Sequence, residues 1–233
     1  MLPMFGFDPT FLLLIPAMIF AFWAQWKVQN TYQKFAQVRA ANGMTGRQMA
    51  QMIMQRNGVT DVGIEPVGGM LSDHYDPRSK VVHLSAPIYE GDSISSIAVA
   101  AHEVGHVLQH QQGYTPLVLR SAMAPVVGFA SAAAFPLFFI GLIFRIPGVS
   151  PMLMDLGILF FAAAVLFHVV TLPVEFDASR RALAQLTSSG AVMPQEVAQA
   201  KQVLDAAALT YIAAAAMAAL QLIRLILIRD SRR

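Results

Sequence analysis

The residues of this chain with the clearest chemical meaning form the pattern H-E-x-x-H at positions 102–106. Four residues along a helix return two side chains to one face, so His102 and His106 can reach the same metal ion. Glu103 lies about 100° further round the helix, beside that ion rather than among its protein ligands. Two neutral imidazoles suit zinc, and a nearby carboxylate can take a proton from zinc-bound water. The pattern therefore predicts a hydrolytic zinc site.

This chemistry requires a helix around positions 102–106, and the surrounding sequence predicts one. Asp92 or Ser93 can cap its start, and a proline-free run of apolar and small residues follows from Ile94 to Leu108. The chain has six His and five Glu in 233 residues, and random placement gives on the order of 0.003 matches to the pattern. Two incidental histidines on a helix are therefore a poor explanation.

The pattern supplies only two ligands, whereas a catalytic zinc ion usually takes three from the protein and leaves its fourth position to water. A third histidine six residues after His106 is excluded, because that residue is Gln112. Thiolate ligands are excluded as well, because the chain contains no cysteine. The third ligand is therefore expected to be a carboxylate or a distant histidine.

The composition is that of an integral membrane protein. Hydrophobic residues make up 56% of the chain and charged residues only 13%, whereas soluble domains contain about 25% charged residues. The net charge of +2 is too small to suggest a nucleic-acid partner. The expected surroundings are therefore a lipid bilayer.

Charge-free intervals predict where the chain crosses the bilayer. They contain 18, 24, 19 and 18 residues, at 9–26, 121–144, 156–174 and 206–223. Because about 20 apolar residues cross the hydrocarbon core, four transmembrane helices are expected. The predicted division is span 1 at 1–26, a zincin-like segment with the H-E-x-x-H helix at 27–120, span 2 at 121–144, span 3 at 152–174, a third-ligand helix and cytoplasmic segment at 175–205, and span 4 at 206–228.

Two details of these spans need a physical interpretation. No Lys or Arg precedes Lys27, so the first span lacks the basic start of a cleaved signal peptide and is expected to be a retained helix. Arg224 interrupts the last apolar run, and its long side chain is expected to snorkel toward the membrane surface.

The basic residues predict the orientation. Segments 27–120 and 175–205 share one face and contain eight and three Lys/Arg, whereas the opposite face has Arg145, Arg229, Arg232 and Arg233, with Arg224 if it snorkels that way. The positive-inside rule then places the eleven-charge face in the cytoplasm and both termini outside. A multi-pass membrane protein with its active site on the cytoplasmic side is therefore expected.

This topology favours Glu175 as the third ligand. Two spans return the chain to the side of the H-E-x-x-H helix at Glu175, within a predicted helix that continues to Leu186. The alternative role of Glu175 is an ion pair with Arg180 or Arg181. Glu196 is a competing ligand, although an acid at the start of a helix also stabilises the helix N-terminus.

Three segments of the chain resemble the bacterial neutral zinc metallopeptidase family, often called YugP-like. They read LSDHYDP at 71–77, AAHEVGH at 100–106 and VEFDASRRA at 174–182. The resemblance implies a zinc peptidase bound to the bacterial inner (cell) membrane, distantly similar to the heat-shock and prenyl-protein membrane proteases of the gluzincin group. In those proteins H-E-x-x-H is followed by a ligand glutamate in the pattern E-x-x-x-D. Carried over, this implies that His102, His106 and Glu175 bind zinc and that Glu103 is the base.

The chain departs from that pattern at one point. The position four after Glu175 is Ser179, and the aspartate is Asp177, only two residues on. Residues two apart do not share a helix face. The spacing therefore does not predict for Asp177 the supporting role of the family's aspartate, although Asp177 remains a candidate for the outer shell of the site.

Shorter signals predict the elements around the site. Thr45 and Gln48 can form a capping box for a helix that ends near Asn57-Gly58. Residues 62–67 and 80–84 are expected to be short strands. Such strands beside the zinc helix could offer an edge to an extended peptide, as the gluzincin resemblance supports.

The remaining histidines have weaker signals. His74 and Tyr75, in a turn-rich segment before a strand, are candidates for oxyanion stabilisation, although a pair in a surface loop is the favoured alternative. His168 lies seven residues before Glu175 and could bond a neighbouring helix or approach the site. A structural or outer-shell role is expected for His110, and a place on a strand surface for His83.

Together these observations predict a mainly α integral membrane protein, with four transmembrane helices and a zincin-like unit made of the H-E-x-x-H helix and a small β-sheet. The expected activity is zinc-dependent cleavage of membrane-associated or unfolded polypeptides, and a membrane-protein partner or a homo-oligomer is compatible with it. Two alternatives remain open: a non-catalytic scaffold or chaperone with a structural zinc, and a metal hydrolase that acts on a lipid or an amide.

Overall fold

The computed structural model describes residues 9–69, 72–144 and 146–231. Residues 1–8 of the predicted first span, Leu71 of the LSDHYDP segment and three of the counted arginines lie outside this part. Within it, four helical segments are long and apolar enough to cross a membrane, as predicted: Pro9–Ala36, Thr115–Phe144, Val149–Ser188 and Pro194–Asp230. The first consists of a 3-10 turn, Pro9–Leu14, and helix α1, Ile15–Ala36.

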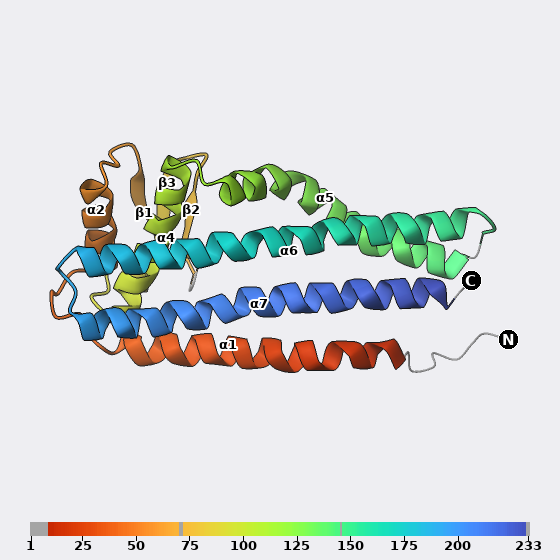
Figure 1. The fold of residues 1–233 in the computed structure, drawn as a ribbon, viewed down its shortest axis with the longest axis horizontal. Helices are drawn as coiled ribbons and strands as arrows, with labels where there is room; N and C mark the ends of the chain where they lie inside the picture. Colours follow the sequence, from red (N-terminus) through yellow and green to blue (C-terminus); the bar gives the residue numbers. More distant parts are fainter. Residues whose placement is uncertain (1–8, 70–71, 145, 232–233) are drawn as a thin grey trace. The chain divides into compact units, whose positions relative to one another are not determined.

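The other three segments are single helices, which Figure 1 shows as long ribbons. Helix α5 is Thr115–Phe144, α6 is Val149–Ser188 and α7 is Pro194–Asp230. As predicted, α6 continues beyond its apolar segment through Glu175, so the apolar segment and the predicted third ligand belong to the same helix. Prolines lie inside α5 and α6, a feature that membrane helices tolerate better than soluble ones.

The chain divides into two compact units. The first contains Met1–Trp23, Leu119–Thr171 and Tyr211–Arg233, and the second contains Ala24–Val118 and Leu172–Thr210. In the first unit Gly157 lets α6 approach α5, since a Cβ there would lie 2.7 Å from the carbonyl oxygen of Ala134. Small residues at such crossings are typical of helix packing in membranes.

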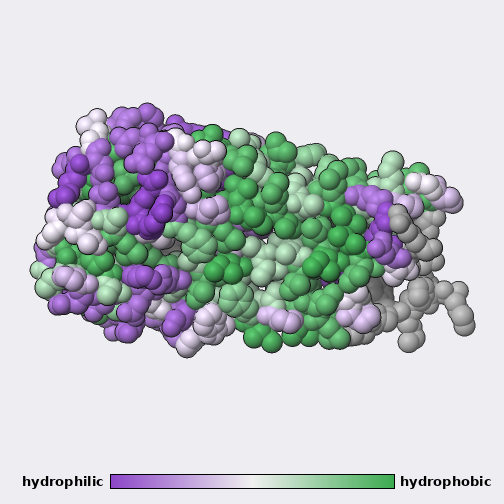
Figure 2. Space-filling view, in the orientation of Figure 1, coloured by the Kyte–Doolittle hydropathy of each residue, from purple (hydrophilic) through white to green (hydrophobic). Residues whose placement is uncertain are grey.

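The surface of the first unit is apolar. Large side chains such as Phe129, Ile143 and Leu159 are exposed on its helices. Figure 2 shows hydrophobic residues over the middle stretches of the long helices, and hydrophilic residues over α2, the strands and the neighbouring ends of the long helices. Apolar surface on this scale is unfavourable in water and suits lipid. Arg224 donates to the hydroxyl of Thr10 over 3.3 Å, and its guanidinium lies over the ring of Phe11.

The second unit contains the shorter elements. They are α2 (Gly46–Arg56), β1 (Gly63–Val67), β2 (His74–Asp76), β3 (Val81–Ser85), α3 (Ala86–Tyr89) and α4 (Ile94–Gln111). The capping box predicted at Thr45 and Gln48 is present, and α2 ends at Asn57 as expected. The two predicted strands correspond to β1 and β3.

The sheet has the order β1-β3-β2, with β1 parallel and β2 antiparallel to β3. The expectation of a turn-rich segment at His74 and Tyr75 was wrong, because these residues belong to β2. A strand of three residues is too short to show the alternation by which strands are predicted. Pairing with β3 forms it, with Tyr75 opposite Val82.

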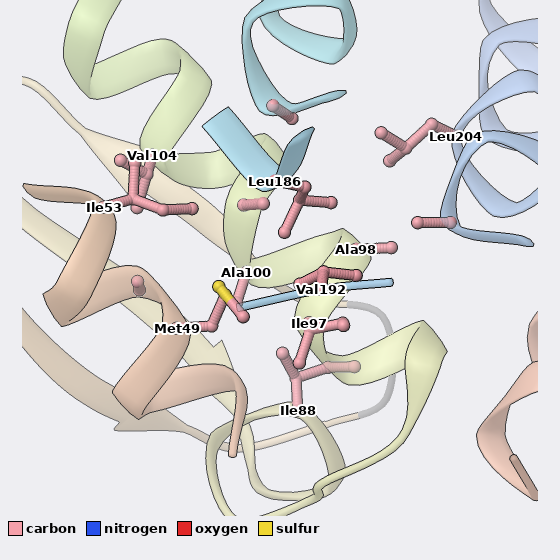
Figure 3. Close-up of a cluster of buried hydrophobic side chains, with 14 of the residues drawn as sticks. Met49, Ile53, Ile88, Ile97, Ala98, Ala100, Val104, Leu186, Val192 and Leu204 are labelled. Carbon is pink, nitrogen blue, oxygen red and sulfur yellow. The ribbon is translucent and has the colours of Figure 1, made fainter. Parts of the chain in front are cut away.

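The hydrophobic core of the second unit lies between α2 and α4. Figure 3 shows Met49 and Ile53 of α2 facing Ile97 and Val104 of α4, and all four are buried. Leu186 of α6 joins the same core. Helix α4, which contains positions 102–106, is therefore held in place by packing along most of its length.

Candidate metal centre

Helix α4 presents the two histidines from a well-defined start. The hydroxyl of Ser93 accepts a hydrogen bond from the backbone N–H of Ser96, which confirms one of the two predicted caps. His102 and His106 follow one turn apart, with ring centroids 4.8 Å apart and the rings edge to face. One face of α4 thus offers two imidazoles side by side.

A close contact between backbones brings α6 to this face. A Cβ added to Gly105 would lie 2.4 Å from the carbonyl oxygen of Ala178, so only glycine fits between α4 and α6 at this point. Glu175 precedes Ala178 by three residues, which is nearly one helical turn. The glycine inside H-E-x-x-H therefore allows the carboxylate of α6 to reach the imidazoles of α4.

Three ligand atoms converge in this place. Oε2 of Glu175 lies 3.2 Å from Nε2 of His102 and 3.6 Å from Nε2 of His106, and all three groups have ligand atoms within 4.8 Å of one another. Zinc bonds to nitrogen of 2.0–2.1 Å place the corners of a tetrahedron about 3.3 Å apart. The spacing of the three atoms therefore fits a zinc ion.

The second ring nitrogens of both histidines have partners. Nδ1 of His102 lies 3.1 Å from the hydroxyl of Ser179, and Nδ1 of His106 lies 3.0 Å from Oε1 of Gln109. Metal-binding histidines usually hold their other nitrogen in this way. Ser179 thus stands where the family pattern has an aspartate. The sequence interpretation missed Gln109, although its position three residues after His106 places it on the same face of α4.

Glu103 is buried beside the histidine pair, with 7% of its surface exposed. Burial raises the pKa of its carboxyl, and the nearby carboxylates of Glu175 and Asp73 act in the same direction, while the two imidazoles oppose them. A carboxyl group in this state is suited to take up a proton.

The competing glutamate has a structural role. Glu196 is buried, and its two carboxylate oxygens accept from the backbone N–H groups of Ala41 and Met193 at 2.7 and 2.8 Å. This is the N-terminal role that the sequence offered as its alternative. It stabilises the start of α7 and fixes the chain that follows α1.

Asp177 pairs with the two arginines that the sequence suggested as partners of Glu175. Both Arg180 and Arg181 bind the carboxylate of Asp177. Asp177 also accepts from Nε2 of Gln109 over 3.0 Å. Asp177 therefore contacts a residue that bonds His106, whereas Glu175 faces the two histidines.

The predicted oxyanion pair contacts other histidines. The ring of His74 stacks on that of His83 at 4.7 Å, and its Nδ1 donates to the carbonyl of Ser72. The hydroxyl of Tyr75 lies 2.7 Å from Nδ1 of His110. Burial, and then the carboxylates of Asp61 and Asp76, raise the pKa of Tyr75 to about 12, so its phenol is neutral. The oxyanion role stays a prediction.

His168 belongs to the first unit. It is half-buried in α6, with its ring edge against the ring of Phe167. Its approach to the site stays a prediction.

Comparison with known proteins gives one consistent result. The model of a family described as "Putative neutral zinc metallopeptidase" matches residues 10–230. A protein of Bacillus subtilis (strain 168), described as "Putative membrane protease YugP", is 49% identical over 216 residues, which cover 93% of this chain and 94% of that protein. No solved structure matches the chain significantly.

Proposed function

Because the chain belongs to this neutral zinc metallopeptidase family, we propose that it is a membrane-bound zinc endopeptidase with a site of the gluzincin type. In this proposal His102, His106 and Glu175 hold the zinc ion, and Glu103 is the general base. The observation that carries it is the convergence of three ligand atoms from α4 and α6 next to a buried carboxyl group.

The side chains divide the chemistry between them. A zinc ion bound here supplies a Lewis acid that polarises a peptide carbonyl and makes water a better nucleophile. Glu103 takes a proton from the attacking water and returns it to the leaving amine. The raised pKa of Glu103 favours this uptake. Ser179 and Gln109 hold the two imidazoles in orientation.

The proposed substrates are polypeptides that are membrane-associated or unfolded. Glu175 follows directly on the apolar segment 156–174 of the same helix, which supports a site at the membrane boundary. Strand β2 lies at an edge of the sheet and packs against α4. An extended peptide that pairs with this edge would be held by its main chain, so many side-chain sequences would be tolerated.

A cavity in the same unit supports a peptide substrate. Its volume is about 230 Å³, and His110, one turn beyond His106 on α4, is among its lining residues. Val59, Val62 and Val107 contribute apolar surface, and the other lining residues are polar or charged, among them the ion-paired Asp61 and Lys80. A space of this size with a mixed lining suits one side chain of a peptide rather than a lipid tail.

The decisive experiment replaces Glu103 with Gln. Zinc content should stay at the parent level, because Glu103 is not among the proposed ligands. Hydrolysis of an unfolded casein-type substrate by the purified, zinc-loaded protein should fall about 10²–10⁴-fold. Glu65→Gln, the same change at an exposed position, should leave both unchanged.

The outcomes separate the proposal from its alternatives. A scaffold with a structural zinc would keep its function in Glu103→Gln. If the protein is a lipid or amide hydrolase, the parent should turn over lipid extracts but leave peptides uncut. Glu103→Gln should then lose the turnover of lipid extracts. Full peptide cleavage by Glu103→Gln would overturn the proposed mechanism.

A further inference from the structure

We propose that Gln109 is the positioning residue of the metal centre, and that Asp177 sets the direction of its amide. Together they hold His106 as the tautomer that carries its proton on Nδ1, so that Nε2 faces the metal position with a free lone pair. This inference rests on the proposed zinc site but not on the proposed reaction.

The hydrogen bonds of Gln109 leave its amide one orientation. The side chain is fully buried, and Nε2 donates to the carbonyl of Val174 over 2.8 Å and to Asp177 over 3.0 Å. A primary amide has two N–H donors, and both are used on groups that only accept. The reversed amide would place its oxygen against two acceptors, in a buried place where such contacts are costly.

The orientation of the amide determines the state of the imidazole. With Nε2 of Gln109 turned to α6, its Oε1 must face Nδ1 of His106, at 3.0 Å. An amide oxygen only accepts, so Nδ1 carries the hydrogen. In a neutral imidazole the other nitrogen then bears the lone pair, and Nε2 of His106 is the atom that lies among the three converging ligand atoms.

Asp177 is itself held in place from both sides. Arg180 and Arg181 both bind its carboxylate, one oxygen of which accepts from Nε2 of Gln109. Arg181 also donates to Oε1 of Gln112, the residue that ends α4, and its guanidinium lies 5.6 Å from the centre of the Tyr114 ring. The same bonds that direct Gln109 thus tie the end of α4 to α6.

The two histidines are supported differently. Ser179 bonds Nδ1 of His102 through a hydroxyl, which can donate or accept. A hydroxyl fits either tautomer, whereas the amide of Gln109 fits only one. We therefore expect neutral His106 to carry its proton on Nδ1 already in the metal-free protein. His102 is expected to take up the tautomer that binds the metal only when the metal binds.

This arrangement also accounts for the spacing of two residues between Glu175 and Asp177, where the E-x-x-x-D pattern has four. Asp177 is too close in sequence to Glu175 to share its face of α6, so it cannot support a ligand in the way of an aspartate four residues on. Gln109, three residues after His106, bridges the remaining gap.

The test compares Gln109→Met, which keeps the length but removes the amide, with the exposed Gln111→Met as its control. Zinc dissociation constants come from chelator competition with the full-length protein. Loss of such a partner typically weakens metal binding about 10–100-fold, so this weakening is expected for Gln109→Met and a change under about twofold for Gln111→Met.

A second readout reports the tautomer itself. In metal-free protein at pH 9, ¹⁵N NMR of labelled histidines should show His106 protonated on Nδ1, and Gln109→Met should give a tautomer mixture. A merely structural role would lower the unfolding temperature without changing this signal. Unchanged zinc affinity, or an unchanged tautomer in a folded Gln109→Met, would overturn the proposal.

A charge exchange keeps the proposal testable if Gln109→Met does not fold. Gln109→Glu places two carboxylates next to each other, so it should bind zinc more weakly than the parent. Adding Asp177→Asn should raise the zinc affinity of Gln109→Glu at least about fivefold, because the two residues are coupled neighbours. Strictly additive losses would contradict the proposal. These affinities do not depend on proteolysis, so a failure of the proposed reaction would be seen separately in Glu103→Gln.

Discussion

Gly105 and Ala178 touch through their backbones, with room for no side chain between them: a Cβ on Gly105 would lie 2.4 Å from the Ala178 carbonyl oxygen. This contact sets the distance between the helix that offers two imidazoles and the helix that offers Glu175. The second variable position of H-E-x-x-H is therefore constrained in this protein by packing.

We expect Gly105→Ala to separate α4 from α6. Overpacking of this kind costs about 1–3 kcal/mol, more than the 0.5–1 kcal/mol or so that alanine contributes to a helix interior. Both the unfolding temperature and the zinc affinity should therefore fall. Gly128→Ala is the control, because a Cβ there meets nothing within 4 Å. Parent-like zinc affinity in Gly105→Ala would mean that the helix spacing does not set the site.

Glu175 and Glu196, both buried, should respond differently to the same substitution. Glu175→Gln removes a proposed ligand, so zinc affinity should fall by more than the roughly 10–100-fold that is typical of an outer partner. Glu196→Gln should lower the unfolding free energy by about 1–2 kcal/mol through weaker N-terminal hydrogen bonds, and zinc content should be retained. Metal analysis combined with thermal unfolding distinguishes the two. Loss of zinc from Glu196→Gln alone would reverse the assignment.

Zinc binding should release a proton near neutral pH. Burial lowers the pKa of His106, but the carboxylate of Glu175, whose Oε2 lies 3.6 Å from Nε2 of His106, outweighs this and raises the pKa above its usual value. A zinc ligand must be neutral, so below the raised pKa zinc displaces a proton, and its affinity climbs up to about tenfold per pH unit. Above that pKa the dependence on His106 ends. Calorimetry in two buffers of different ionisation enthalpy measures the release, and a pH-independent affinity between pH 6 and 8 would contradict it.

The proposed orientation can be tested without removing any native thiol, because the chain has no cysteine. Gln195 and Ser231 are exposed near opposite ends of α7, and a helix of 37 residues is about 55 Å long. In intact cells a membrane-impermeant thiol reagent should label Ser231→Cys and reach Gln195→Cys only after lysis. The opposite labelling pattern would place the site outside the cytoplasm.

The sequence by itself determined the features that depend on short range or on hydropathy. His102 and His106 share a face because helical geometry repeats every four residues or so. The four membrane segments were confirmed because charge is excluded from the hydrocarbon core whatever the tertiary contacts are. The capping box at Thr45 and the cap at Ser93 are likewise local.

Only the tertiary structure decided which distant groups meet. Glu175 and Glu196 were both plausible ligands in the sequence, and the Gly105–Ala178 contact brings the first to the imidazoles while Glu196 binds two backbone N–H groups. The link from Asp177 through Gln109 to His106 joins two helices across more than sixty residues. The periodicity of the sequence within either helix does not predict such a contact, because the contact arises from the packing of one helix against the other.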